Sequence, residues 1–383
     1  MPTRLPLSAL LSQALVAYTI EFDNEYEQRA PHITTVARSG GLGEWPGPWL
    51  TSQAMWTNFI RYIGENGTPV RDLQAMACLS EPAIKSRLHH LEWWRYLTFA
   101  PAPGETRAKP RYRDLLVHLT PHGRTARDHW KPLNAAIDKR WKARFGKSTM
   151  DNLVSALRTI AAGVGQNMPD YLPVVDFPGG FPVKLVIPED PPPHKRPPID
   201  RLDISALLSR ALLQLALEFE AASDISLTIA ANVLRVIEEG GTPTRDLPMR
   251  GGVAKEGVTV AVNFLNKNGF VKVGTDKDKV VRFTAKGKAA HEQYGTTLIA
   301  IEKRWEKSLG KAKLNLLRES LASLDEPGKS GRSRLAEAIE PKPGAWRTDK
   351  RYAPQTEAYL QDPRGSLPHY PFISHRGGFP DGA

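Results

Sequence analysis

The chain has 383 residues, 41% of them hydrophobic, and a formal net charge of +11. This length and composition allow two or three domains with packed cores. No run of about 18 apolar residues occurs, which excludes a transmembrane helix, and the single cysteine, Cys78, excludes an intrachain disulfide. The positive charge favours a polyanionic partner, chiefly nucleic acid.

The most informative feature is an internal repeat. GTPVRDL at 67–73 returns as GTPTRDL at 241–247, with six of seven residues identical. Upstream, segments 5–22 and 202–219 share 10 of 18 residues, and further matches follow downstream in the same order. The repeat is far longer than the units of roughly 20–50 residues that form solenoids and propellers. It therefore predicts the duplication of a whole domain.

The repeat suggests a division of the chain into four parts. We place the first copy at 1–165 and the second copy at 201–325. A Pro/Gly-rich arm and linker at 166–200 joins them, and a second Pro/Gly-rich arm occupies 326–383. Both arms contain the motif GGFP. We expect the arms to dock on the core and cover apolar surface.

Apolar residues at spacings of three and four predict the first helices of each copy. One helix covers 5–28 with a single apolar stripe, and its counterpart runs from Ile204 to Phe219. A second helix is expected at 50–65, with Leu227–Glu239 as its counterpart. Each second helix is followed by glycine, a common helix stop.

The repeated segment, GTPVRDL at 67–73 and GTPTRDL at 241–247, then predicts the start of another helix. We expect Thr68 as its N-cap and Pro69 as its first residue, in a short helix at 69–77. Ser80 would cap the following helix, so that the two form a helix-turn-helix. The buried face of that second helix would comprise Ile84, Leu88 and Leu91.

A β-hairpin, or wing, is expected after each helix-turn-helix. Segment 96–120 alternates apolar and polar residues around a Pro/Gly-rich tip, and 270–284 does so with a shorter tip. Long helices follow at about 121–162 and 285–324. The sequence therefore predicts a mainly α protein with small β-wings.

This order of elements resembles the MarR family of winged helix-turn-helix regulators. The resemblance is carried by LTPHG at 119–123, by LSEPAIKSRLHHLEWW at 79–94 and, in the second copy, by the corresponding segments 284–287 and 253–271. It implies two tandem MarR-like domains whose terminal helices form an intramolecular pseudo-dimer. The tandem form departs from the usual single-domain subunit and is similar to the duplicated actinobacterial type.

The resemblance also implies how DNA would be contacted. Two recognition helices would enter successive major grooves about 34 Å apart. In the first copy, Lys85, Ser86 and His89 would meet base edges and Arg87 a phosphate. Alternation in the wing would place four cations on one face of an extended strand. These four are Arg107, Lys109, Arg111 and Arg113.

We expect weaker DNA contact from the second copy. Its helix offers Lys255, Thr259 and Asn263, but Glu256 and the acidic residues of its wing oppose binding. Its remaining DNA-contacting cations would be Lys277, Lys279 and Arg282. A role chiefly as dimerisation partner is the alternative for this copy.

The sequence thus predicts a DNA-binding transcriptional regulator of the cytoplasm, associated with the nucleoid, with double-stranded DNA as partner. A protein-interaction module built on winged helices is the alternative. No residue pattern indicates a catalytic, cofactor or metal site, and no membrane partner is expected. A small-molecule effector and a homodimer of the tandem chain stay open.

Overall fold

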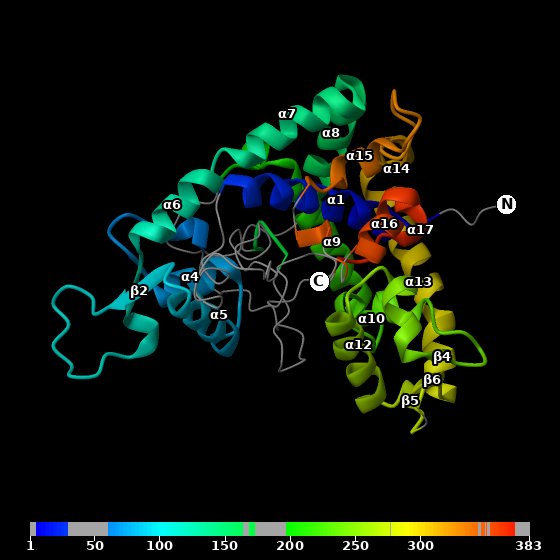
Figure 1. The fold of residues 1–383 in the computed structure, drawn as a ribbon, viewed down its shortest axis with the longest axis horizontal. Helices are drawn as coiled ribbons and strands as arrows, with labels where there is room; N and C mark the ends of the chain where they lie inside the picture. Colours follow the sequence, from blue (N-terminus) through cyan, green and yellow to red (C-terminus); the bar gives the residue numbers. More distant parts are fainter. Residues whose placement is uncertain are drawn as a thin grey trace.

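The protein is mainly helical and carries two small antiparallel sheets of three strands each (Figure 1). The computed structural model describes residues 5–29, 60–163, 168–172, 197–275, 277–343, 346–348, 350 and 353–371. The expectation of a mainly α fold with small β-elements is confirmed.

Two helices, α1 (Leu7–Arg29) and α9 (Ile204–Glu220), pack along each other at the centre of the molecule. Two more, α8 (Lys147–Gly163) and α14 (Lys311–Ser323), pack against one another and against this central pair. Burial extends around both central helices, so that even the polar Gln13 is 0% exposed. The sequence predicts these helices with one apolar stripe each. Their polar sides are also buried because other segments of the chain cover them.

The first copy forms a strand, two helices, a hairpin and two further helices between α1 and α8. In its sheet, β3 lies between β1 and β2 and is antiparallel to both. The elements are η1 (Ile60–Tyr62), β1 (Thr68–Pro69), α4 (Val70–Ala77), α5 (Glu81–Trp93), β2 (Leu97–Ala100), η2 (Tyr112–Asp114), β3 (Leu116–Leu119), α6 (Pro121–Trp130) and α7 (Leu133–Phe145).

The second copy repeats the order strand, helix, helix, hairpin between α9 and α14, with one helix before the strand and a single long helix after the hairpin. Its sheet has the same arrangement, with β6 between β4 and β5. After η3 (Ile199–Arg201) and α9, the elements are α10 (Leu227–Leu234), β4 (Thr242–Pro243), η4 (Thr244–Asp246), α11 (Leu247–Gly251), α12 (Lys255–Lys267), β5 (Val271–Val273), β6 (Val280–Phe283) and α13 (Ala285–Leu309).

The repeated phrase begins as a strand, which corrects the expected helix cap at Thr68. Thr68 and Pro69 pair with β3, and the helix starts only at Val70. The Thr68 hydroxyl donates to the carbonyl of Tyr62 at 2.9 Å and accepts from the amide of Gly64 at 3.0 Å, so it closes the preceding turn instead. The arginine of the repeated segment pairs in both copies with an aspartate that precedes the middle strand of the sheet, β3 or β6. These pairs are Arg71–Asp114 at 2.9 Å and Arg245–Asp278 at 2.7 Å.

The threonine and glycine that follow each hairpin have one structural role. The Thr120 hydroxyl caps α6 by accepting from the amide of Gly123 at 3.0 Å. A Cβ on Gly123 would lie 2.0 Å from the carbonyl oxygen of Tyr96, so only glycine fits there. In the second copy, Thr284 caps α13 through Gly287 at 3.1 Å in the same way. The motif thus docks a helix onto the hairpin in both copies.

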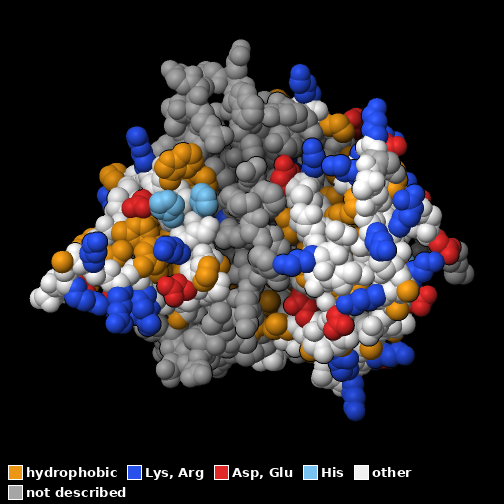
Figure 2. Space-filling view, turned by 90° about the horizontal axis from the view of Figure 1, so that it is seen from below, with side chains coloured by type: hydrophobic (Ala, Val, Ile, Leu, Met, Phe, Trp, Pro, Cys, Tyr) orange, Lys and Arg blue, Asp and Glu red, His pale blue; other side chains and the backbone are white. Residues whose placement is uncertain are grey.

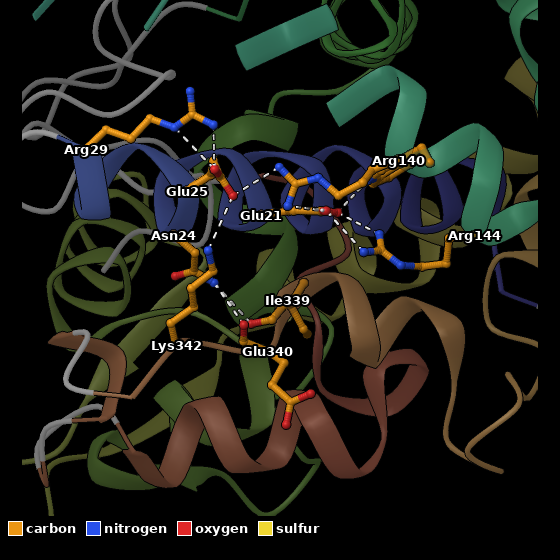
Figure 3. A network of polar contacts seen from close by, with 10 residues as sticks. Glu21, Asn24, Glu25, Arg29, Arg140, Arg144, Ile339, Glu340 and Lys342 are labelled. Atoms are coloured by element: carbon orange, nitrogen blue, oxygen red, sulfur yellow. Dashed lines mark hydrogen bonds and ion pairs between the residues drawn. The ribbon is translucent and has the colours of Figure 1, made fainter. Parts of the chain in front are cut away.

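A glutamate on each central helix binds a tryptophan of the same copy. Trp141 of α7 donates from its indole nitrogen to Glu21 at 2.8 Å, and Trp305 of α13 donates to Glu218 at 2.8 Å. Arg144 and Arg140 also pair with Glu21, at 2.7 and 3.5 Å, within the network drawn in Figure 3. These contacts hold α1 against α7 and α9 against α13.

Three other expected helices are shorter or divided in the structure. The helix of the second copy that was expected to reach Glu239 ends at Leu234. Of its counterpart at 50–65, only the η1 turn and the residues after it lie within the described part of the chain. The long segment at 121–162 is divided into α6, α7 and α8, and the one at 285–324 is divided at Gly310.

The C-terminal arm folds back onto the core as helices. Its elements are α15 (Arg334–Ile339), η5 (Trp346–Thr348), α16 (Ala353–Gln361) and α17 (Pro363–Ser366). Leu335 and Leu367 are 0% exposed, and α15 packs against α1. In Figure 3, the Asn24 amide of α1 points at the carbonyls of Ile339 and Glu340 at the end of α15.

The arm of the first copy also docks where it is described. Asp170 is 1% exposed and pairs with Arg210 of α9 at 2.6 Å, while Tyr171 donates to Asp203 at 2.6 Å. The expectation that the arms dock thus holds for 168–172 and for the part of the C-terminal arm up to 371. Both GGFP motifs lie outside the described residues.

Candidate nucleic-acid interface

The first copy presents α5 as the second helix of its helix-turn-helix. Ser80 stands at the N-cap position, although its side chain makes no capping hydrogen bond. The face predicted from the sequence is buried, with Ile84, Leu88 and Leu91 all 0% exposed. Lys85 and His89 are exposed on the opposite face, and Ser86 is half-buried.

The structure places Arg87 in the core, which corrects its expected position at a phosphate. Its exposed fraction is 2%. The spacing of the helix explains this, because residue 87 follows Ile84 by three and precedes Leu91 by four. The periodicity that predicts the apolar face therefore contained the signal for a buried arginine.

The four cations of the first wing lie on a loop and not on a strand, which corrects the expected single face. Residues 101–115 connect β2 to β3, and Arg113 belongs to the η2 turn within this loop. All four side chains are exposed. The alternation of cations did not predict a strand because three prolines, at positions 101, 103 and 110, interrupt backbone pairing.

One of these cations is occupied by acidic neighbours. Arg107 pairs with Glu105 at 2.5 Å and with Asp114 at 2.9 Å. The hydrogen bonds from Arg107 lower the pKa of Glu105 to about 2. Arg111 and Arg113 make no ion pair with the described residues, so they remain the exposed positive charges of this loop beside Lys109.

The wing loop folds back onto α5 through an aromatic contact. The Lys85 ammonium lies 5.5 Å from the ring centroid of Tyr112 in η2. Tyr112 in turn packs on Phe99 of β2, with ring centroids 5.4 Å apart. Burial raises the pKa of the Tyr112 hydroxyl above its ordinary value. Lys85 therefore extends along the wing as well as toward solvent.

The second copy presents α12 in the equivalent position. Lys255, Thr259 and Asn263 are all exposed, and the Thr259 hydroxyl donates to the Lys255 carbonyl at 2.8 Å. The wing cations Lys277, Lys279 and Arg282 are exposed too, with Arg282 on β6. Asp276 lies outside the described residues.

Two exposed residues of these helices were not among the expected contacts. Trp93, the last residue of α5, is 64% exposed although it is large and apolar. Lys267, the last residue of α12, is also exposed. Both continue the four-residue spacing of the exposed stripes, His89 to Trp93 and Asn263 to Lys267, and that spacing is the sequence signal for them.

Lys and Arg side chains are spread over both halves of the face that carries α5 and α12. Figure 2 views the molecule from below, the side toward which both helices extend from α1 in Figure 1. Acidic side chains lie among the basic ones on both halves. Basic side chains are thus present, together with acidic ones, at the surface where the two helices are displayed.

A half-open cavity of about 380 Å³ lies between α13, α14 and the residues before α1. Its walls include Leu298, Ile299 and Leu314, with Glu302 and Arg318 at one side. Neither Trp93 nor Trp94 belongs to its lining. The small-molecule effector stays a prediction.

In the part of the chain that the structure describes, no helix has the length and apolar character needed to cross a membrane. Nor do three or more His, Cys, Asp or Glu side chains cluster there as metal ligands would.

Comparison with known proteins gives no relative: no family model, curated protein or solved structure matches the chain.

Proposed function

We propose that the chain is a DNA-binding transcriptional regulator with two winged helix-turn-helix units of the MarR type, and not an enzyme. The observation that carries the proposal is the order strand, helix, turn, helix, hairpin, which occurs twice with the same sheet arrangement. Each second helix displays an exposed polar stripe, and exposed cations lie on each hairpin. This is the arrangement in which one helix enters a major groove and a wing lies along the backbone.

The central helices support an intramolecular pseudo-dimer. The α1–α9 and α8–α14 pairs each join one helix of the first copy to the equivalent helix of the second. Each copy separated from the other would leave one side of its long helices uncovered. We therefore expect the fragments 1–165 and 200–325 to self-associate or aggregate in light scattering. Two well-behaved monomers would show that the copies share no core.

DNA binding is tested with the full chain and a pool of randomised duplexes. We expect the chain to enrich specific duplexes and the affinity to fall steeply with salt concentration, because phosphate contacts release counterions. Because the exposed side chains of α5 and α12 differ, the enriched site should be asymmetric. Absence of enrichment and of salt-dependent binding would reject a DNA-binding function.

A protein-interaction module is the second candidate. The exposure of Trp93 and the pairing of Arg107 with two carboxylates favour it for the first copy. Exposed aromatic residues are typical of protein interfaces, whereas paired arginines contribute less to phosphate binding. A chain that binds no duplex would direct attention to this surface.

A further inference from the structure

The two helix-turn-helix units present different surfaces at equivalent positions. α5 and α12 have the same length, so their exposed stripes can be compared residue by residue. The stripe on α5 comprises Glu81, Lys85, His89 and Trp93. The stripe on α12 comprises Lys255, Thr259, Asn263 and Lys267.

The stripe on α5 is poorly suited to reading base edges. His89 lies 3.6 Å from Glu92 on the same helix, and Lys85 lies over the Tyr112 ring. The exposed indole of Trp93 offers only one donor to a base edge, and Glu81 would face an anionic backbone. Arg87, the cation expected to anchor this helix, is buried.

The exposed stripe on α12, by contrast, is well suited to reading base edges. Both ends carry lysine, which binds phosphate or guanine. Glu256, the acidic residue expected to oppose binding, is half-buried and lies outside this row. Asn263 carries an amide that can pair bidentately with adenine. Thr259 and Asn263 are separated by one helical turn, about 6 Å along the axis, which spans about two base-pair steps.

The C-terminal arm fixes the turn that leads into α12. Gly252 ends α11 in the left-handed region, with φ of 68°, and its carbonyl accepts a 2.8 Å hydrogen bond from the hydroxyl of Tyr359 on α16. A Cβ on Gly252 would lie 2.1 Å from the carbonyl oxygen of Ser366. The backbone of the arm thus lies directly against the turn between the two helices.

A second contact joins the arm to the preceding helix, α10. The side chain of Asn232 donates to the carbonyl of Tyr370 at 2.7 Å and accepts from the amide of His369 at 2.8 Å. Asn232 is 3% exposed, so these hydrogen bonds are shielded from water. The arm therefore contacts α10 as well as the turn that ends α11.

The other side of the same segment is anchored to the central helix α1. The Ser12 hydroxyl donates to the carbonyl of Pro368 at 2.8 Å. Gln13 and Arg364 exchange hydrogen bonds, with the Arg364 guanidinium donating to the Gln13 side chain at 2.8 Å. Segment 353–371 thus connects the turn before α12 to the helix at the centre of the pseudo-dimer.

We propose that α12 is the base-reading helix of this chain and that segment 353–371 is the element that positions it. This inference rests on the proposed DNA-binding function. The sequence had suggested that the first copy makes the stronger DNA contact, and this inference reverses that expectation. In the asymmetric DNA site, the half contacted by Thr259 and Asn263 should bind tightly, and the half contacted by α5 should bind weakly.

The reading helix is tested with the full chain and the duplex that the wild type enriches. Asn263→Ala and Thr259→Ala are compared with the matched variants His89→Ala and Lys85→Ala, all at exposed positions. Asn263→Ala should weaken binding to the enriched duplex about tenfold or more and relax the preference for adenine in one half. His89→Ala should change affinity less than about threefold. A larger loss from the α5 variants would overturn the inference.

The positioning role is tested with Tyr359→Phe, which removes the hydroxyl that donates to the Gly252 carbonyl and accepts from the Gln355 side chain. Tyr171→Phe is the matched control, since its hydroxyl is bonded to Asp203, far from α12 in the chain. Tyr359→Phe should lower the ratio of specific to non-specific duplex affinity several-fold, and the control should leave that ratio unchanged. Equal loss for both kinds of duplex, or no loss, would overturn the positioning role.

The outcomes separate the two proposals. A wild-type chain that binds no duplex rejects the proposed function, and the inference with it. A wild-type chain that binds DNA but is insensitive to changes at Asn263, Thr259 and Tyr359 rejects the inference alone.

Discussion

The two copies keep their internal contacts and differ in what they display. The ion pair Arg71–Asp114 recurs as Arg245–Asp278, with distances of 2.9 and 2.7 Å. At the surface, by contrast, His89 of α5 stands where α12 has Asn263. A duplicated domain retains the side chains that hold its frame, whereas its exposed stripes are free to diverge. Functional differences between the copies are therefore to be sought on α5, α12 and the two hairpins.

The contacts that hold each copy together are not equally buried in the two copies. The Glu21 side chain is 5% exposed, and Glu218 is 21% exposed. In the first copy, the C-terminal arm packs beside this network, where Lys342 lies 3.5 Å from Glu25 (Figure 3). Because the contacts of Glu21 are more buried, they should contribute more to the free energy of unfolding than the equivalent contacts of Glu218.

The largest effect is expected from the glycines that dock a helix onto each hairpin. Gly123→Ala and Gly287→Ala would place a Cβ 2.0 and 1.8 Å from a backbone carbonyl oxygen. Each should lower the free energy of unfolding by about 3 kcal/mol, because backbone on both sides must shift. Denaturant unfolding of the full chain measures this. Gly163→Ala, where nothing lies near the added Cβ, is the control. If Gly287→Ala left the free energy of unfolding unchanged while Gly123→Ala lowered it, the two glycine contacts would not be equivalent.

The two glutamates should have unequal effects, with a loss in the first copy as large as that of the glycine variants and a smaller loss in the second. Glu21→Ala leaves the Trp141 indole and Arg144 without their buried partner and should cost about 3 kcal/mol. Glu218→Ala removes a more exposed pair, with Arg304 and Trp305, and should cost about 1 kcal/mol. Denaturant unfolding of both variants decides. Equal losses would show that burial by the C-terminal arm does not strengthen the network of the first copy.

Much of this frame could be predicted from the sequence because it is periodic and local. The spacing of Ile84, Leu88 and Leu91 predicted the buried face of α5, and the same spacing includes Arg87, which was misassigned because arginine is usually exposed. The strand at Thr68 was missed because its two residues form it only by pairing with β3, where their partners Val117 and Leu116 lie 49 and 47 residues further along the chain. A distant partner of this kind leaves no local signal.

The candidate site was less predictable than the frame. Alternating cations suggested a strand in the first wing, but the ion pairs of Arg107 and the packing of Tyr112 form only after the loop has folded. The contact between Tyr359 and Gly252 joins residues 107 positions apart in sequence, across the polar C-terminal arm. The sequence predicted that this arm docks on the core, but it did not indicate which residues of α1 and α10 hold the arm through hydrogen bonds.

A moderate effect on DNA affinity is expected from the first wing. Arg111→Ala with Arg113→Ala removes two exposed charges that pair with no described residue, so it should reduce the salt slope of binding by up to about two. Arg107→Ala is the matched variant and should change the slope by less than about one, because Glu105 and Asp114 already neutralise this charge. Affinity measured over a salt series distinguishes the two. An unchanged slope in the double variant would remove the first wing from the interface.

The smallest effect on stability is expected where Asp138 of the first copy meets Asp203 of the second, and it depends on pH. Burial and, next, the carboxylate of Asp203 raise the pKa of Asp138 to about 7, although the Tyr18 hydroxyl donates to Asp138 at 2.7 Å. The folded chain therefore binds a proton at Asp138 that the unfolded chain releases near pH 4, so this group makes stability fall as pH rises from about 4 to about 7. Asp138→Asn removes that dependence. Its melting temperature relative to the wild type should increase by a few degrees between pH 5 and pH 8.

The second copy provides the control for this measurement. Glu302 occupies the equivalent position and accepts from the amide of Leu7 at 2.6 Å, but its partner there is Arg318 and not a second carboxylate. Replacing Glu302 by Gln breaks this ion pair, so it should lower the melting temperature at both pH values, with no gain at pH 8. If the two variants behaved alike, the charge environments of Asp138 and Glu302 would be the same, and the comparison between the copies would fail at this point.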